Sequence, residues 1–313
     1  MAAASSATSI SVAGKQRPPR RTEGGGFIIA DIMSGLPATK TDPFLIWHEL
    51  PRHSYRRGEM PGAPMHPHRG FNEVPYAKLL SGPTEYNMMN VKDHEGREVK
   101  MQTGAVEWGK VAIGLEHEAL IDNRWHGEMH FFQLWVNLPR AHKFDAPSFQ
   151  RAAPNVLPVV SVAKDGKARA KILVGKLEDK RSPVQSELTP VQYIDFMADI
   201  GAEINHTPPL ECTTMYMYVY AGQGDVRGTV VTQGEFIILS GTGTLTVKCT
   251  VARADRGGDD YDLGFLFIAG RPIGEPIVQH GPFVMTSREE IVQCFDDYQR
   301  GRLCQKPLSY KEY

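Results

Sequence analysis

The stretch Met65-His66-Pro67-His68-Arg69-Gly70-Phe71-Asn72-Glu73 decides the fold of this 313-residue sequence. Residues i and i+2 of a strand point to the same face, so His66 and His68 can direct both imidazoles into a barrel and chelate one metal ion. The same spacing also suits two surface histidines. A third histidine, His117, follows about fifty residues later, at the distance where a later barrel strand returns to the first. We therefore predict a site at which three imidazoles converge.

Most of the remaining sequence has the pattern of short strands. Runs bounded by Gly, Pro and Asp lie at 84–91, 129–138, 192–200, 214–220 and 263–268. Apolar residues occupy every second position from 194 to 200, which is typical of a strand with one face in a core. Closely spaced strands of this kind favour a sandwich or barrel. One helix is predicted near the C-terminus, where Ser287 and Glu290 can form a capping box and Gly301 can end the helix.

The length of the chain favours two domains of ordinary size. The Pro-rich stretch 139–158 is the best candidate for a linker, and we place the boundary near residue 150. The first domain would then span 27–150 and hold the metal. The second would span 151–313, include the helix and lack metal, because its only histidines are His206 and His280.

Charge, hydropathy and cysteine usage exclude several classes of protein. The formal net charge of -1 argues against direct binding to nucleic acid, which needs a clustered excess of Lys and Arg. No apolar run approaches the length of a membrane-spanning helix, and we expect no secretory signal. The cysteines contain no Cys-x-x-Cys pair, which suits free thiols in a reducing compartment.

Residues 1–26 are predicted to lie outside the fold. They are rich in Ala and Ser, contain no acid before Glu23, and carry the basic residues Lys15, Arg17, Arg20 and Arg21. Three interpretations compete: a disordered basic tail, an organellar transit peptide and a basic nuclear-import patch. We adopt the disordered tail and keep organellar targeting as an alternative.

Two long motifs stand in order along the chain. The first is His66–Phe71, followed by Val74 and Tyr76, and the second is Gln133–Pro139. Together they resemble signatures of the pirin family, which are bicupins of the cupin superfamily. The likeness continues through 42–45, 182–184, 274–276 and 281–285, so it covers nearly everything from 27 to 303. The resemblance implies an all-β fold of two facing antiparallel cupin β-barrels with a short C-terminal helix.

The resemblance also implies a ligand set. Pirins typically hold their metal with two histidines of the first motif, a third histidine further on, and a glutamate two residues after that. Carried over, the histidines are His66, His68 and His117, whereas the glutamate position is occupied by Ala119. The implied cofactor is one iron ion, Fe(II) or Fe(III), in the first domain of each chain. Another divalent transition metal is the alternative.

The departure at Ala119 leaves the fourth ligand open. Glu116 and Glu118 flank His117, but neighbours in an extended strand point to opposite faces, so neither can replace the carboxylate without a bulge. Glu73 stands where cupins often place an acidic ligand. We therefore predict three histidines completed by Glu73 or by water.

Other residues are weaker candidates. His126 and His130 precede a strand-like run, which favours a surface or outer position over direct ligation. Trp135 and Phe71 can wall a pocket for a flat aromatic ligand or pack in a core. No local motif for a Ser/His/Asp or Cys/His nucleophile is present.

Two functions follow from the resemblance. The first is an iron-loaded regulator in the nucleus and cytoplasm that contacts transcription-related or other regulatory proteins in a metal- or redox-dependent way. The second is an oxygenase similar to quercetin 2,3-dioxygenase, with a flavonol as substrate at the same iron site. We expect no membrane association and a monomer.

Overall fold

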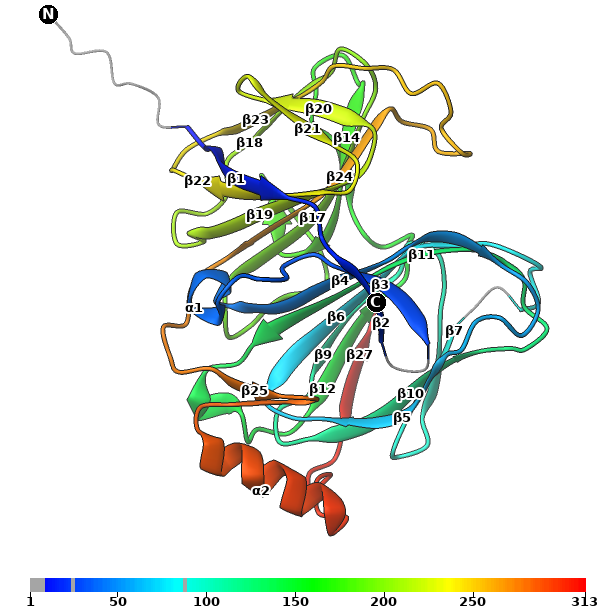
Figure 1. The fold of residues 1–313 in the computed structure, drawn as a ribbon, viewed down its shortest axis with the longest axis vertical. Coiled ribbons are helices and arrows are strands. Elements are labelled where there is room, and N and C mark those ends of the chain that lie inside the picture. Colours follow the sequence, from blue (N-terminus) through cyan, green and yellow to red (C-terminus); the bar gives the residue numbers. More distant parts are fainter. Residues whose placement is uncertain (1–8, 24–25, 87–88) are drawn as a thin grey trace, which may run out of the picture. The chain divides into compact units, whose positions relative to one another are not determined.

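The structure, a computed structural model, describes residues 9–23, 26–86 and 89–313. The described chain is mostly β-strand and divides into two compact units (Figure 1). We call the first unit the histidine domain; it comprises Pro19–Val156, Pro183–Thr189 and Ile273–Tyr313. The second domain comprises the described part of Met1–Pro18 together with Leu157–Ser182 and Pro190–Pro272.

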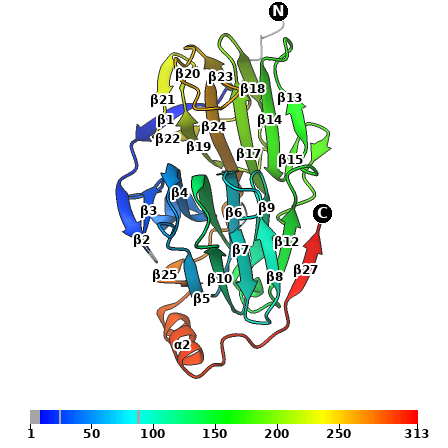
Figure 2. The same cartoon turned by 90° about the vertical axis from the view of Figure 1, so that its right-hand side faces the viewer.

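Two main sheets form the described part of the histidine domain. The larger sheet contains, in spatial order, β2 (Arg20–Glu23), β3 (Phe27–Asp31), β4 (Phe44–Tyr55), β11 (Gly127–Asn137), β6 (Phe71–Leu80), β9 (Val106–Lys110), β12 (Ser148–Ala152) and β27 (Ser309–Glu312). The smaller sheet, seen in Figure 2, contains β5 (Ala63–His68), β10 (Leu115–Ile121), β7 (Met89–Asp93) and β8 (Glu98–Met101). The hairpin β25 (Val278–His280) to β26 (Phe283–Met285), the helices α1 (Ala38–Thr41) and α2 (Arg288–Gln299), and the 3-10 turn Arg140–His142 complete it.

The second domain repeats this plan of a larger and a smaller sheet. The larger contains β1 (Ser11–Gln16), β22 (Glu235–Ser240), β19 (Thr214–Ala221), β24 (Leu263–Gly270), β17 (Val191–Ala198), β14 (Ala168–Val174) and β13 (Val159–Ser161). The smaller contains β18 (Glu203–His206), β23 (Leu245–Cys249), β20 (Gln223–Val226) and β21 (Thr229–Thr232), and β15 (Lys176–Leu177) pairs with β16 (Lys180–Arg181). Its core is aliphatic and aromatic, and includes Phe196, Phe265 and Phe267.

The prediction that residues 1–26 lie outside the fold is wrong for the described residues 9–23. Strand β1 pairs antiparallel with β22, and β2 pairs antiparallel with β3. Ile10 is fully buried in the core of the second domain, and the Lys15 ammonium lies 3.1 Å from the Glu235 carboxylate. The hydrogen-bonded pairing of β1 and the burial of Ile10 just before it outweigh the polar composition of this stretch. Residues 1–8 and 24–25 of the predicted tail lie outside the described residues.

The predicted domain boundaries also differ from the structure. Helix α2 belongs to the histidine domain and not to the second, because Ile291 and Cys294 pack against Phe283, Met285 and Leu303. The stretch 139–158 that was predicted as a linker contains β12, a strand of the histidine domain. The chain therefore leaves the histidine domain and returns to it, which composition alone does not reveal.

The predicted cap of the C-terminal helix is present in the structure. Ser287 caps α2 by accepting from the Glu290 amide, and the capping box is complete. Val292, an apolar residue of this helix, is exposed. In the run 84–91, residues 87–88 lie outside the described residues and β7 begins at Met89. None of the described helices is long and apolar enough to cross a membrane.

The burial of Ile10 generates a stability prediction. Ile10→Ala should lower the free energy of unfolding by about 2–5 kcal/mol, because the truncation leaves a cavity in a close-packed core. The measurement is urea denaturation of the full chain followed by circular dichroism. Ile28→Ala, at a side chain that is 59% exposed, is the matched control and should have little effect. Equal effects of the two substitutions would show that Ile10 is not part of the core.

Candidate metal centre

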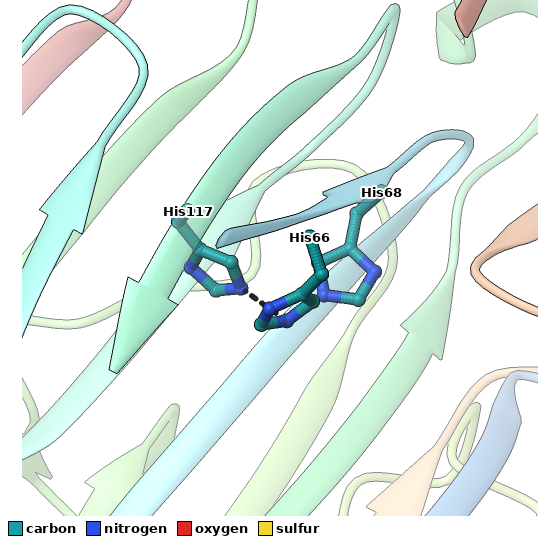
Figure 3. A group of neighbouring side chains, drawn as sticks. All are labelled: His66, His68 and His117. Carbon is teal, nitrogen blue, oxygen red and sulfur yellow. Dashed lines mark hydrogen bonds between the residues drawn. The ribbon is translucent and has the colours of Figure 1, made fainter. Parts of the chain in front are cut away.

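The three predicted histidines come together on two neighbouring strands. His66 and His68 project from the same face of β5, and His117 projects from β10 (Figure 3). The strands pair antiparallel with His117 directly across from His66 and Leu115 across from His68. Cross-strand partners of this kind bring their side chains within reach of each other. One nitrogen from each ring lies within 4.8 Å of the other two.

The ring nitrogens are arranged for ligation. The Nε2 atoms of His66 and His117 are 3.1 Å apart, and His66 Nδ1 lies 2.6 Å from the carbonyl oxygen of Pro64. If Nδ1 of His66 donates to this carbonyl, its Nε2 keeps a lone pair that faces the other rings. Holding one ring nitrogen by an outer hydrogen bond is the usual way of orienting a metal-binding imidazole.

Burial keeps all three imidazoles uncharged. His68 and His117 are buried, and His66 is partly buried. Burial lowers the pKa of His117 to about 3 and places the pKa of His68 well below its ordinary value, with a smaller contribution from neighbouring rings. Burial also lowers the pKa of His66. The site therefore offers neutral imidazoles, the form that binds metal, throughout the neutral pH range.

The Glu73 carboxylate lies beside the histidines on β6. Oε1 of Glu73 is 3.4 Å from Nδ1 of His117, and Oε2 is 3.9 Å from Nε2 of His68. The residue is 1% exposed, and burial, with a further contribution from Glu107, raises its pKa well above the ordinary value. Gln133 donates to Oε2 at 3.3 Å. Glu73 faces the ring nitrogen of His117 opposite the one nearest His66, a position that suits an orienting partner; its role as fourth ligand stays a prediction.

The donor set fits a divalent transition metal. Among the described residues that line the cavity, five buried polar atoms lack a hydrogen-bond partner: Nδ1 of His68, Nδ1 of His117, Oε1 of Glu73, Oε1 of Gln133 and Nε1 of Trp135. Unsatisfied buried polar atoms are costly and rare in folded proteins. Three imidazoles with one carboxylate are donors that iron, zinc, copper and nickel all accept. The residues therefore fit a metal ion without identifying it.

Ala119 shares the inward face of β10 with His117. The pairing of β10 with β7 is regular from His117 to Ile121, so side chains at 117 and 119 point the same way. The irregularity lies in the pairing with β5, where Ala119 faces Ala63. Ala119 lines the same cavity as His117, whereas Glu116 and Glu118 do not. The carboxylates that flank His117 are therefore turned away from the site.

The histidines and Glu73 line a cavity of about 840 Å³ between the two sheets of the histidine domain. Its walls are mostly apolar and include Ile46, Leu50, Met89, Val91, Met101 and Phe131. Trp135 also lines the cavity and stacks on Phe71, with ring centroids 4.0 Å apart. Phe71 supports the wall from behind rather than lining it, which separates two residues that the sequence had grouped.

A polar cluster on the cavity wall was missed by sequence reasoning. Arg21 and Glu23 of β2 and His48 of β4 line the cavity, and the His48 ring lies 3.1 Å from Glu23 and 3.7 Å from Asp31. Arg21 lies 3.3 Å from Asp31. Two of these residues fall in the stretch that was excluded from the fold. The sequence did carry a signal for this cluster, because Arg21 and Glu23 are two residues apart and therefore share one face of a strand.

The weaker histidine candidates lie apart from the site. His126 is exposed, and its Nδ1 is 3.2 Å from the carbonyl oxygen of Arg124. His130 is buried and bonded to the Glu49 carboxylate at 2.7 Å. In the second domain His206 is buried beside Gln192. Within the described chain, only His66, His68 and His117 form a group with metal-binding geometry.

Comparison with known proteins identifies relatives of the whole chain. The family model described as Pirin matches residues 29–136, and the model of the Pirin C-terminal cupin domain matches residues 193–304. A pirin-like protein of Caulobacter vibrioides is 32% identical over 282 residues, which are 90% of this chain and 94% of the relative. A protein of Pseudomonas aeruginosa, named as a candidate quercetin 2,3-dioxygenase, is 31% identical over 289 residues, which are 90% of this chain and 94% of that protein.

The solved structures show the same fold. The crystal structure of quercetin 2,3-dioxygenase from Acinetobacter baumannii aligns with a TM-score of 0.81 at 24% identity, covering 94% of this chain and 98% of that one. This likeness concerns the fold. Together with the strand content and the family models, it confirms the predicted all-β fold of two cupin domains with a short C-terminal helix.

The register of β10 can be tested with one pair of variants. Ala119→Glu should place a carboxylate beside His117, tighten metal binding by about tenfold or more, and lower the reduction potential of bound iron, because an anionic ligand favours the ferric ion. Glu118→Ala should leave metal affinity unchanged, since its side chain faces away. Titration with Fe²⁺ under argon measures both. Loss of binding in Glu118→Ala, with no change in Ala119→Glu, would place the fourth ligand at Glu118.

The raised pKa of Glu73 generates a pH prediction. A carboxyl group that holds its proton above pH 4.5 must release it to bind or support a metal ion, whereas the histidines are already neutral. Metal affinity should therefore rise as pH increases toward the pKa of Glu73, by up to about tenfold per unit. Glu73→Gln should bind more weakly and show a flat profile over the same range. A profile that is equally steep in both proteins would assign the released proton to another group.

Proposed function

This chain belongs to the pirin family of bicupins, and on that premise we propose that it binds one iron ion on His66, His68 and His117 and acts on a flat aromatic substrate, in the manner of a quercetin 2,3-dioxygenase. The observation that carries the proposal is the position of the three histidines on the wall of a large, mostly apolar cavity. A purely structural metal would be enclosed by its ligands. A metal beside open space can accept a further ligand.

The cavity suits a flavonol in size and character. Its volume of about 840 Å³ lies within the range of about 300–1,000 Å³ that is usual for small-molecule pockets. The apolar walls can bury aromatic rings, and Trp135 offers a ring face for stacking. Relatives named for quercetin dioxygenase activity support the same substrate class.

A residue beside the histidines can accept a proton from the substrate. An iron ion held by these histidines would supply Lewis acidity and redox chemistry. Glu73 is the carboxylate nearest the histidines, and its raised pKa brings its proton exchange closer to the working pH. A base with a pKa near the operating pH is the most effective acceptor of a phenol proton. Gln133 fixes the carboxylate by donating to Oε2.

A metal-dependent regulator in the nucleus and cytoplasm is the second proposal. It is supported by the connection between the turn that follows His68 and the surface helix α2, through the ion pair of Arg69 with Asp297. A change at the metal site can reach a surface that a regulatory protein could contact. The near-neutral net charge of -1 favours protein partners over nucleic acid.

Metal analysis combined with oxygen uptake tests the proposals. The purified protein should contain one iron per chain and consume oxygen when quercetin is added. In His66→Ala/His68→Ala the affinity for metal should fall by more than about 100-fold, which is the loss expected when only a hydrogen-bond partner of a ligand is removed. Quercetin-dependent oxygen uptake should be lost as well. His53→Ala/His126→Ala removes the same number of histidines from exposed positions and should retain both properties.

Each result decides between the proposals. Stoichiometric iron with no oxygen uptake would refute the oxygenase and leave the regulator. Stoichiometric iron in His66→Ala/His68→Ala would refute the metal site itself, and both functions with it.

A further inference from the structure

The turn that follows His68 is held by the C-terminal segment of the chain. Arg69 forms a bridge with Phe283, in which the Arg69 amide donates to the Pro282 carbonyl at 3.3 Å and the Val284 amide donates to the Arg69 carbonyl at 3.0 Å. These bonds join residues more than 200 positions apart in sequence. The residue next to a predicted ligand is therefore fixed by β26.

The Arg69 side chain extends this connection to helix α2. It is 1% exposed, and its Nη1 atom donates to Asp297 Oδ2 at 2.8 Å. The same guanidinium donates to the carbonyl oxygens of Ile113 and Leu303. Ile113 lies just before β10, the strand that carries His117. One buried cation thus contacts the segments that carry both histidine strands and the helix.

Lys143 also holds the turn that follows His68. The residue is 1% exposed, and its ammonium donates to the carbonyl oxygen of Gly70 at 2.6 Å, to Asn137 Oδ1 at 2.7 Å and to the carbonyl oxygen of Val284 at 3.1 Å. The backbones approach so closely that a Cβ atom at Gly70 would lie 1.9 Å from the Val284 carbonyl oxygen. Gly70 also has a φ of +95°, which favours glycine. The turn cannot shift without moving β26.

The same segment reaches the cavity and the surface. Gln279, Gly281 and Pro282 line the cavity together with the histidines. Beyond β26, helix α2 buries Ile291, Cys294 and Asp297 and exposes Val292. The segment from Gln279 to Leu303 therefore contacts the site at one end and presents a surface at the other.

We propose that Arg69 and Asp297 are a positioning pair that couples occupancy of the metal site to the order of helix α2. Metal on His66, His68 and His117 restrains β5 and β10, hence the turn and the Ile113 carbonyl, and through Arg69 it restrains α2. The inference rests on the proposed metal binding and adds the element through which a partner could sense it. Coupling of this kind is reciprocal, so disorder in α2 must weaken metal binding by the same factor.

Asp297→Asn tests the pair, and Asp296→Asn is its matched control. Both remove one negative charge from the same helix, but Asp296 pairs with Arg300 and Arg302 on the surface and does not contact Arg69. Asp297→Asn leaves the buried guanidinium without its counterion. We expect it to weaken Fe²⁺ binding under argon by about tenfold, within the 5–150-fold range typical of coupled sites. Asp296→Asn should bind as the unmodified chain does.

Hydrogen exchange provides a readout that does not depend on activity. In the unmodified chain, Fe²⁺ should slow amide exchange in 288–299 by about tenfold. In Asp297→Asn this slowing should largely disappear, and in its metal-free form the amides of Arg69 and Gly70 should exchange faster. Asp296→Asn should show the full effect of the metal.

The outcomes separate this inference from the proposed function. If the unmodified chain binds Fe²⁺ and exchange in α2 does not change, the coupling is refuted while the metal site stands; this arm needs no variant and so survives a failure of Asp297→Asn to fold. Equal loss of affinity in the two variants would refute the role of Arg69. If the unmodified chain binds no metal, the proposed function fails and the coupling fails with it.

Discussion

The register between β5 and β10 is the constraint on which the metal site depends. Side chains alternate along a strand, so a slip of one residue would turn His117 away from His66. Leu115 and Ile121 share the inward face of β10 with His117, and both are buried. Their burial therefore decides which face of β10 points inward, and His117 lies on that face. The apolar core and the polar site are specified by the same alternation.

This arrangement determines the charge of the metal-free site. Burying three imidazoles and a carboxylate would be prohibitive if all were ionised, because isolated charges are expelled from low-dielectric surroundings. The lowered pKa values of His68 and His117 and the raised pKa of Glu73 keep the cluster close to neutral. A metal ion then enters a pocket that carries little opposing charge, and the carboxyl group can compensate it by releasing a proton.

How much the sequence predicts depends on how local the information is. His66, His68 and His117 could be found because strand period and barrel spacing are properties of the sequence itself, and the capping box of α2 is equally local. The place of β1 could not, since the burial of Ile10 just before it depends on core residues such as Ile237 and Leu239 of β22, far along the chain. The domain that receives α2 was equally inaccessible, because the contact of Asp297 with Arg69 spans 228 positions. Chain order suggested two consecutive domains, whereas long-range packing decides the division.

The buried ionisable groups near His68 differ in charge. The imidazoles are uncharged, whereas the cations Arg69 and Lys143 are buried and each donates three hydrogen bonds to carbonyl or carboxylate oxygens. Burial lowers the pKa of Lys143 to about 8, so these contacts and not solvent must sustain its charge. Two of the acceptors, the Val284 carbonyl and the Asp297 carboxylate, belong to β26 and α2, which lie in the C-terminal segment of the chain. The turn after His68 therefore reaches its final geometry only when the C-terminal segment is in place. Under the two proposals, a ligand in the cavity and a protein on α2 would both act on that turn, so the proposals share one structural element.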